Sequence, residues 1–436
     1  MHLPALNIPD LYLSLWRGTM ECDKNDNKDT WDWAVFRDIS IWKEHGREVA
    51  AATPYIPGSF DRPPRNPAEK MNSGYKAWEY LLYFFGLGPC LFYGRLPHKY
   101  WMQYCKLVQG VTILLQDSIA QAEIKESNNR LSEACVEFEE LYIQRKAEQI
   151  HFAWPSMHNI AHMPHEVLRV GPGMISSQWT MERTIGNLGE EINLHSNPYA
   201  NIANCGVRRC QINALKAMIP DIDPPAKQPH GALDIGDGFV FLRAKDRTAR
   251  AVTEAEAEAF QEYLEDQGVE VEESFHPQVT RWARLRLPNG QIARSCWKEE
   301  LKELNHLQMT RNVKLNQNGS TGFAEIHYFT TFAVHDTVKF VAVGSFYGAP
   351  HQELYEQSSR TYVSVQHFRD VDIRVFDAKA ILSVVTLFPD PCYPVFFQDG
   401  SQVDQYALMQ KPGLGIGQKL GYRENDAAKN KAKNVK

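Results

Sequence analysis

The residues whose spacing most suggests chemistry lie in the stretch QWTMERTIGNLGEEI, Gln178 to Ile192, whose apolar period predicts a helix. Four apolar neighbours mark the face around Glu182 as buried: Trp179, Met181, Ile185 and Leu188. A buried carboxylate is costly unless a cation or several hydrogen bonds hold it. Glu182 is therefore either the structural partner of an arginine, such as Arg169 or Arg183, or one part of an active site.

Histidines gather just upstream, in HFAWPSMHNIAHMPHE, at positions 151, 158, 162 and 165. His158 and His162 are four residues apart and so share one helical face, a spacing that zinc or a proton relay can use. Pro164 is expected to interrupt the helix before His165 can join them. Neither a cysteine partner nor an HExxH motif accompanies the pair. The pattern favours packing or hydrogen bonding, and a metal-linked role stays open.

A third stretch, NPYANIANCGVRRCQINALKAMIPD, carries cations on a predicted helix. Arg208, Arg209 and Lys216 could grip phosphate, because guanidinium groups match phosphate oxygens. The alternative is an ordinary solvated face. Cys205 and Cys210 have no second pair of cysteines beside them, which is too little for a zinc site.

Composition limits the kinds of partner. The chain has 436 residues, of which 43% are hydrophobic, enough to bury two or three cores. Its net charge of -6 means that any contact with nucleic acid must come from local basic surface. Eight scattered cysteines, no leader and no apolar run near ~20 residues indicate a reducing intracellular compartment and no membrane span.

The chain divides by its periodicity into a mainly helical half and a β-rich half, so we expect an α+β protein. Proline crowding at 220–231 marks the boundary. Within the second half, TEAEAEAFQEYLEDQG predicts a helix with Thr253 as N-cap, Glu256 as its reciprocal partner and Gly268 as the stop. The expected parts are a helical unit at 1–224, a linker with a small α/β segment at 225–310, a β-rich, barrel-like domain at 320–415 and a disordered basic tail at 416–436.

Several of these stretches together resemble a known family. LNIPDLYLSLWRGT and above all SQWTMERTIGNLGEEINLHSNPYANIANCGVRRCQINALKAMIPDIDP resemble transposon proteins of mushroom-forming (basidiomycete-type) fungi, distant relatives of CACTA-type (En/Spm-like) transposases. The resemblance runs through most of residues 1–224 and, more loosely, the β-rich part. It implies a ribonuclease-H-like core with an Asp-Asp-Glu triad, interrupted by a helical insertion. Residues 1–224 would then be that insertion and the final helix of the core.

The resemblance also implies roles for particular residues. MERTIG aligns with the motif that carries the family's last carboxylate, which makes Glu182 the matching catalytic and metal-binding residue. His158 and His162 look like the family's upstream histidine motif, although His158 stands where Asp or Cys is usual. In the complete enzymes two Mg²⁺ (or Mn²⁺) ions held by carboxylates stabilise the attacking and leaving oxygens of strand transfer. The implied partners are DNA (transposon ends) and a homo-oligomer or transposase partner, and the implied compartment is the nucleus.

The start of the chain bears on catalysis. In relatives the second aspartate lies just ahead of a Met-His-Leu sequence, and this chain begins MHLPALNIPD, so both aspartates would lie upstream of Met1. The resemblance therefore implies a catalytically incomplete carboxyl-terminal portion of a transposase. The central strands would also be missing, which would leave the apolar face of Met181, Ile185 and Leu188 exposed or repacked.

We therefore expect the purified chain to show no Mg²⁺-dependent nicking of supercoiled DNA. Robust nicking that Glu182→Gln abolishes would contradict this expectation. Two alternatives remain: a non-catalytic DNA, chromatin or protein-interaction module that uses the C-terminal barrel and basic tail, and a metalloenzyme built on the histidine cluster.

Overall fold

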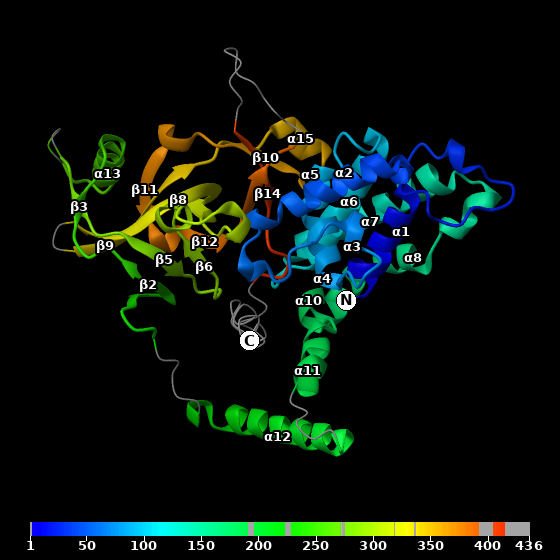
Figure 1. Ribbon diagram of the computed structural model, residues 1–436, viewed down its shortest axis with the longest axis horizontal. Helices are drawn as coiled ribbons and strands as arrows, with labels where there is room; N and C mark the ends of the chain where they lie inside the picture. Colours follow the sequence, from blue (N-terminus) through cyan, green and yellow to red (C-terminus); the bar gives the residue numbers. More distant parts are fainter. Residues whose placement is uncertain are drawn as a thin grey trace, which may run out of the picture.

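The protein is a mixed α+β molecule in which a helical half, residues 3–218, is followed by a β-rich half (Figure 1). The computed structural model describes residues 2–190, 196–222, 228–270, 272, 275–317, 319–334, 337–391 and 404–414, except the side chains of Thr180, Glu182, Arg183, Pro220 and Asp370. The predicted tail at 416–436 lies outside the described residues. None of the helices in the described part is both long and apolar enough to cross a membrane.

The α-helices are α1 Ile8–Trp16, α2 Ile39–Ala51, α3 Pro67–Lys70, α4 Ala77–Tyr80, α5 Gly88–Leu91, α6 His98–Leu114, α7 Gln121–Phe138, α8 Pro155–Ala161, α9 Met163–Val170, α10 Gly173–Ser176, α11 Trp179–Glu190, α12 Pro198–Met218, α13 Glu254–Asp266, α14 Cys296–Glu299 and α15 Gln352–Gln357. Shorter 3₁₀ or π segments are Leu3–Asn7, Lys28–Thr30, Val35–Arg37, Thr53–Tyr55, Gly58–Phe60, Leu81–Leu87, Glu139–Ile143, Ala147–Phe152, Pro220–Ile222, Leu304–His306, Arg369–Val371 and Ala378–Ala380.

The strands are β1 Leu233–Gly236, β2 Phe239–Lys245, β3 Arg250–Ala251, β4 Gln278–Val279, β5 Trp282–Arg286, β6 Ile292–Arg294, β7 Asn312–Gln317, β8 Ser320–Val334, β9 Thr337–Phe346, β10 Val363–Gln366, β11 Ile373–Asp377, β12 Ile381–Val384, β13 Thr386–Pro389 and β14 Gln405–Met409. The predicted change from helices to strands near the proline cluster is confirmed, because α12 ends at Met218 and β1 begins at Leu233.

Aromatic side chains form the core of the helical half. Trp16 of α1 is fully buried among the rings of Phe84, Phe92 and Tyr104, and its Nε1 donates a hydrogen bond of 2.9 Å to the hydroxyl of Tyr142. Such contacts join α1 to segments as distant as Glu139–Ile143, which follows α7, so the sequence-distant helices form one body.

Nine strands share one sheet in the β-rich half. Its path is β1–β2–β5–β8–β7–β12, with β6 on β5, β9 on β8 and β11 on β9. This order does not return to its first strand, so the described strands form an open sheet and not the predicted barrel-like closure. Four of its strands come from 225–310, the segment predicted to be a linker and small α/β unit. That segment and the later strands therefore belong to one sheet.

The two halves also share a core. A three-stranded sheet, β10–β14–β13, carries Phe388, Ala407 and Met409 into the apolar cluster of the helical body. At Gly86 a Cβ would lie 2.2 Å from Sδ of Met409, so the glycine lets the thioether lie directly against the backbone of this segment. The β-rich half is consequently packed on the helices and is not a separately tethered module.

One pair of helices departs from this packing. Figure 1 shows α11 leaving the helical body and α12 lying along the edge of the molecule, between α11 and the strand β2 region. None of the residues of α12 is buried. We call α11 and α12 together the arm.

Candidate functional site

The helix that carries Glu182 is anchored only at its beginning. Trp179, the first residue of α11, packs edge-on against Trp78, with ring centroids 5.2 Å apart. Met181 and Ile185 are 52% and 57% exposed. The buried face predicted around Glu182 is therefore wrong for these two residues, because an apolar period shows what a helix could bury and not what covers it. The family resemblance implied that this face is exposed or repacked, and of these alternatives Met181 and Ile185 show exposure.

The catalytic and metal-binding role of Glu182 stays a prediction, since its side chain lies outside the described residues. One arginine considered as its partner has another contact: Arg169 Nη2 lies 2.6 Å from Glu166 Oε2. The hydrogen bond from Arg169 holds the pKa of the Glu166 carboxyl below its ordinary value.

The histidine pair is formed as its spacing predicts. The Nε2 atoms of His158 and His162 lie 3.0 Å apart, and both side chains are exposed. The chain changes from α8 to α9 at His162, with Pro164 in the first turn of α9, so the predicted interruption is confirmed. Among the described residues, no group of three His, Cys, Asp or Glu side chains could hold a metal ion. The cluster therefore consists of two neighbouring histidines at the surface.

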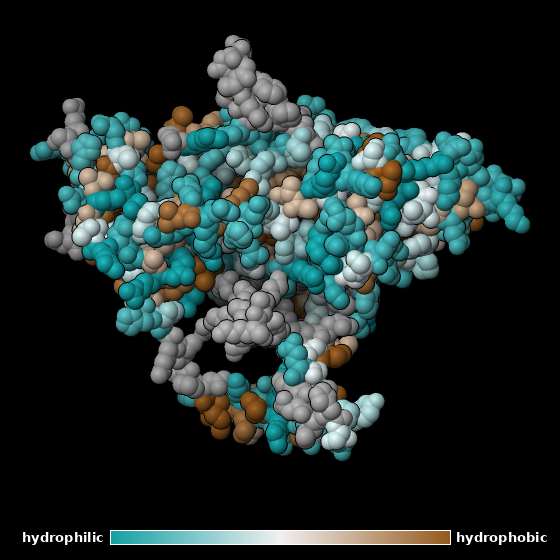
Figure 2. Space-filling model, in the orientation of Figure 1, coloured by the Kyte–Doolittle hydropathy of each residue, from teal (hydrophilic) through white to brown (hydrophobic). Residues whose placement is uncertain are grey.

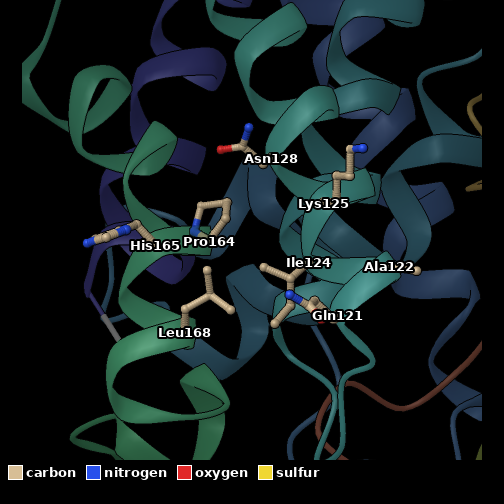
Figure 3. A pocket seen from close by; sticks show the side chains of 8 residues that line it. All are labelled: Gln121, Ala122, Ile124, Lys125, Asn128, Pro164, His165 and Leu168. Atoms are coloured by element: carbon tan, nitrogen blue, oxygen red, sulfur yellow. The ribbon is translucent and has the colours of Figure 1, made fainter.

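His165 lies instead at a groove between α7 and α9, with a volume of about 510 Å³. Figure 3 shows Ile124, Pro164 and Leu168 turned toward one another across it, whereas His165 points away from them. The lining is mixed, and its polar side chains, Gln121, Lys125, Asn128 and His165, do not converge on a point as they do in a substrate site. The groove therefore gives no support to an active site.

The three predicted DNA-binding cations lie on the arm. Arg208 and Lys216 are exposed on α12 and Arg209 is half-exposed. The helix begins after Asn197 with Pro198 at its first position, where a missing N–H costs no hydrogen bond. Its 21 residues, Pro198 to Met218, include no Asp or Glu. The structure thus brings these three cations together on one accessible helix, without carboxylates to neutralise them from within it.

A buried polar cluster in the large sheet was missed by the sequence reasoning. The hydroxyl of Ser345 lies 3.1 Å from Nε2 of His327 and 3.1 Å from Nε2 of His367. Nearby, Arg311 Nε donates to Glu325 Oε1 at 2.6 Å. Burial holds the pKa of His367 below its ordinary value, although the carboxylate of Glu325 acts in the opposite direction. The residues come from separate strands and loops, so no spacing in the sequence could have indicated the cluster.

Local backbone features build this cluster. The pairing of β8 with β9 shifts between Ile326 and Tyr328, a bulge at His327 that re-aims its side chain. On the partner strand, a Cβ at Gly344 would lie 2.4 Å from the carbonyl oxygen of Glu325, so this position requires glycine.

The geometry of the cluster is not that of a hydrolytic triad. Nε2 of His367 faces both the Ser345 hydroxyl and, at 3.7 Å, Oε2 of Glu325, whereas a triad needs the carboxylate on the other ring nitrogen. Ser345 is also fully buried. The cluster is a hydrogen-bonded network that specifies the packing of the sheet.

Among the predicted site residues, the structure therefore places three cations on one accessible helix and two histidines side by side at the surface. Comparison with known proteins found no matching family model, no matching curated protein and no matching solved structure.

Proposed function

We propose that this chain is a transposon-derived DNA-binding protein, the carboxyl-terminal portion of a CACTA-like DDE transposase, which contacts the DNA backbone through α12 and acts in the nucleus. The observation that carries the proposal is the charge of α12. Arg208, Arg209 and Lys216 give this helix three positive charges and no negative one, in a chain whose net charge is -6. Local basic surface of this kind is what phosphate binding requires.

The charge of another helix is consistent with DNA approaching from the side of α12. Helix α13 contains six acidic residues and no basic one, so it repels a phosphate backbone. Figure 1 places α13 and α12 at well-separated parts of the molecule. DNA that approaches from the side of α12 therefore avoids the acidic helix. Arg208 and Lys216, two turns apart, are separated by about 12 Å along the helix.

In this proposal Glu182 is the third carboxylate of the triad, and the ribonuclease-H-like core contributes α11. The described residues do not provide the cluster of carboxylates that Mg²⁺ or Mn²⁺ needs, so we assign no catalytic step to them. The function proposed for this chain is DNA binding.

The test is a salt titration of binding to a fluorescent DNA duplex. Because each phosphate contact contributes ~0.9 to the slope of log K against log salt, replacing Arg208, Arg209 and Lys216 together by Gln should make the slope shallower by about 2.7. A matched control replaces three exposed cations of the helical half, Lys24, Lys43 and Arg47, by Gln. The control has the same net charge and should keep the wild-type slope. Equal slopes for the two variants would show that α12 is not the contact surface.

A further inference from the structure

Exposed apolar side chains are concentrated on and around the arm. Of the 20 large hydrophobic residues that are exposed in the part of the chain that the structure describes, 12 lie between Leu168 and Ile222. Figure 2 shows hydrophobic residues gathered over one end of α12, the end nearer to β2 in Figure 1. Scattered apolar residues at a surface need no explanation, but a contiguous group of this kind is typical of an interface.

One stripe of small or apolar residues of α12 follows a heptad, whereas Ile212 and Leu215 lie outside it. Six residues at successive spacings of three and four form one stripe, and all six are exposed: Ala200, Ala203, Val207, Cys210, Ala214 and Ala217. We call this stripe the seam. Such a spacing keeps residues on one face along the whole helix and is the pattern of helices that pair lengthwise. The opposite face is partly shielded, since Ile202, Cys205 and Arg209 are only half-exposed.

The seam is complementary to itself when two copies run antiparallel. With a two-fold axis midway between Arg208 and Arg209, Val207 faces Cys210 of the other copy and Ala203 faces Ala214. Tyr199 and Met218, the most exposed large apolar side chains of α12 at 85% and 78%, flank the two ends of the seam.

Charge permits this pairing. The positions that flank the seam hold uncharged residues: Tyr199, Asn204, Gly206, Gln211, Asn213 and Met218. Arg208, Arg209 and Lys216 lie outside the seam and its flanking positions, at outer positions of the heptad that do not contact a partner. Like charges are consequently kept out of the interface and stay accessible on the outside of the pair.

The size of the interface sets the expected affinity. A helix of 21 residues is about 31 Å long and ~10 Å across, so half of its lateral surface is roughly 500 Å². The pair would then bury on the order of 1,000 Å² in total, which exceeds most crystal contacts and lies at the lower end of specific interfaces. Such an area fits a dissociation constant in the micromolar range.

We propose that two copies of this chain associate through an antiparallel pairing of α12 along the seam. An isolated helix of this length is only marginally stable in water, and none of its residues is buried in the monomer. The second copy supplies the packing that the rest of its own chain does not. The proposal does not rest on DNA binding, although the pair would present six cations on its outer faces.

The first test is sedimentation of the full chain between about 1 and 100 µM, the range expected from the interface area. The wild type should change from monomer to dimer, and Val207→Glu should weaken the dimer by about 100-fold or more, because it places a carboxylate in the seam. Ile212→Glu is the matched control, since Ile212 is 52% exposed, Val207 is 56% exposed, and Ile212 points away from the seam. That control should dimerise like the wild type.

The second test is cross-linking by oxidation. Val207→Cys places a thiol opposite the native Cys210 of the other copy, so it should form a covalent dimer that reducing agent reverses. Ile212→Cys should stay monomeric on the same gel.

Three results would overturn the proposal: a wild type that stays monomeric at 100 µM, equal effects of the two glutamate variants, or a covalent dimer from Ile212→Cys alone. Loss of binding to DNA or to anionic vesicles in Val207→Glu, with an unchanged sedimentation profile, would show that a different partner covers the seam. Because α12 has no buried residue, each variant should keep the wild-type thermal unfolding of the body.

Discussion

Arg65→Ala is expected to lower the free energy of unfolding by about 3–5 kcal/mol, because it leaves a buried carboxylate without its main partner. Glu79 is fully buried, and its oxygens accept hydrogen bonds from Nε and Nη2 of Arg65 at 2.6 and 3.0 Å. The backbone N–H of Lys76 donates a further bond of 2.9 Å. Arg62 Nε lies farther away, at 3.6 Å, and so cannot replace the bidentate contact.

Chemical denaturation at neutral pH would measure this loss. A matched control is Arg37→Ala, which removes an ion pair with Asp29 whose side chains are 51% and 71% exposed. That variant should lose less than about 1 kcal/mol, because an exposed pair is screened by solvent. Equal losses in the two variants would show that burial does not determine how much the Arg65–Glu79 contact contributes to the free energy of unfolding.

The same pair has a pH dependence. Burial raises the pKa of Glu79, but the hydrogen bonds from Arg65 and Lys76 lower it more, and the net pKa lies below the ordinary value of 4.5. As the pH falls, Glu79 is therefore protonated in the unfolded chain before it is protonated in the folded chain. The stabilisation is complete above pH ~4.5 and is lost as the pH falls through the folded pKa.

His45 is expected to destabilise the protein in mild acid, starting at a higher pH than Glu79. Its ring is fully buried, and Nε2 lies 2.7 Å from the hydroxyl of Tyr83. Nδ1 has no hydrogen-bond partner among the described residues. Burial lowers the pKa of His45 to about 3, and the charge of Arg95 adds to this shift. Below pH ~6.5 the unfolded chain is protonated at this residue and the folded chain is not, so stability falls as the pH falls.

The comparison that isolates this effect is the unfolding free energy of wild type and His45→Gln at a series of pH values. Glutamine can keep a hydrogen bond to Tyr83 but does not titrate. Between pH 6.5 and 4 the wild type should lose about 3 kcal/mol more than the variant, at 1.36 kcal/mol for each unit of pH below the unfolded pKa. Parallel curves for the two proteins would mean that His45 is protonated in the folded state.

Features that depend on neighbouring residues were predicted from the sequence. In α13 the Thr253 hydroxyl accepts from the N–H of Glu256 at 3.4 Å, and Glu256 Oε2 accepts from the N–H of Thr253 at 2.7 Å, which is the predicted capping box. Gly268 ends that helix region with φ at +74°. The run TVKFVAVGSF, whose period of two predicts a strand, forms β9, Thr337–Phe346. Each is decided within a few residues, by capping, backbone sterics or alternation.

Local cues were less complete in SGYKAWEYLLYFFGLG, whose aromatic and apolar residues predict a buried helix that begins at Ser73. The helix begins instead at Ala77, because the side chain of Glu79 reaches back to the N–H of Lys76. The chain then continues as a π segment, Leu81–Leu87, before α5. The buried character of this segment was predicted correctly, and its boundary was not.

The sequence by itself determined the residue types and spacings of this protein: the cations and heptad of α12, the histidine pair of α8 and the alternation of the strands. The tertiary structure alone decided that Met181 and Ile185 are exposed, that β1, β2, β5 and β6 join the large sheet, and that Ser345 lies between two histidines. The physical reason is the range of the interactions. Periodicity and capping act over a few residues, whereas burial and polar clusters depend on which distant segments the chain brings together.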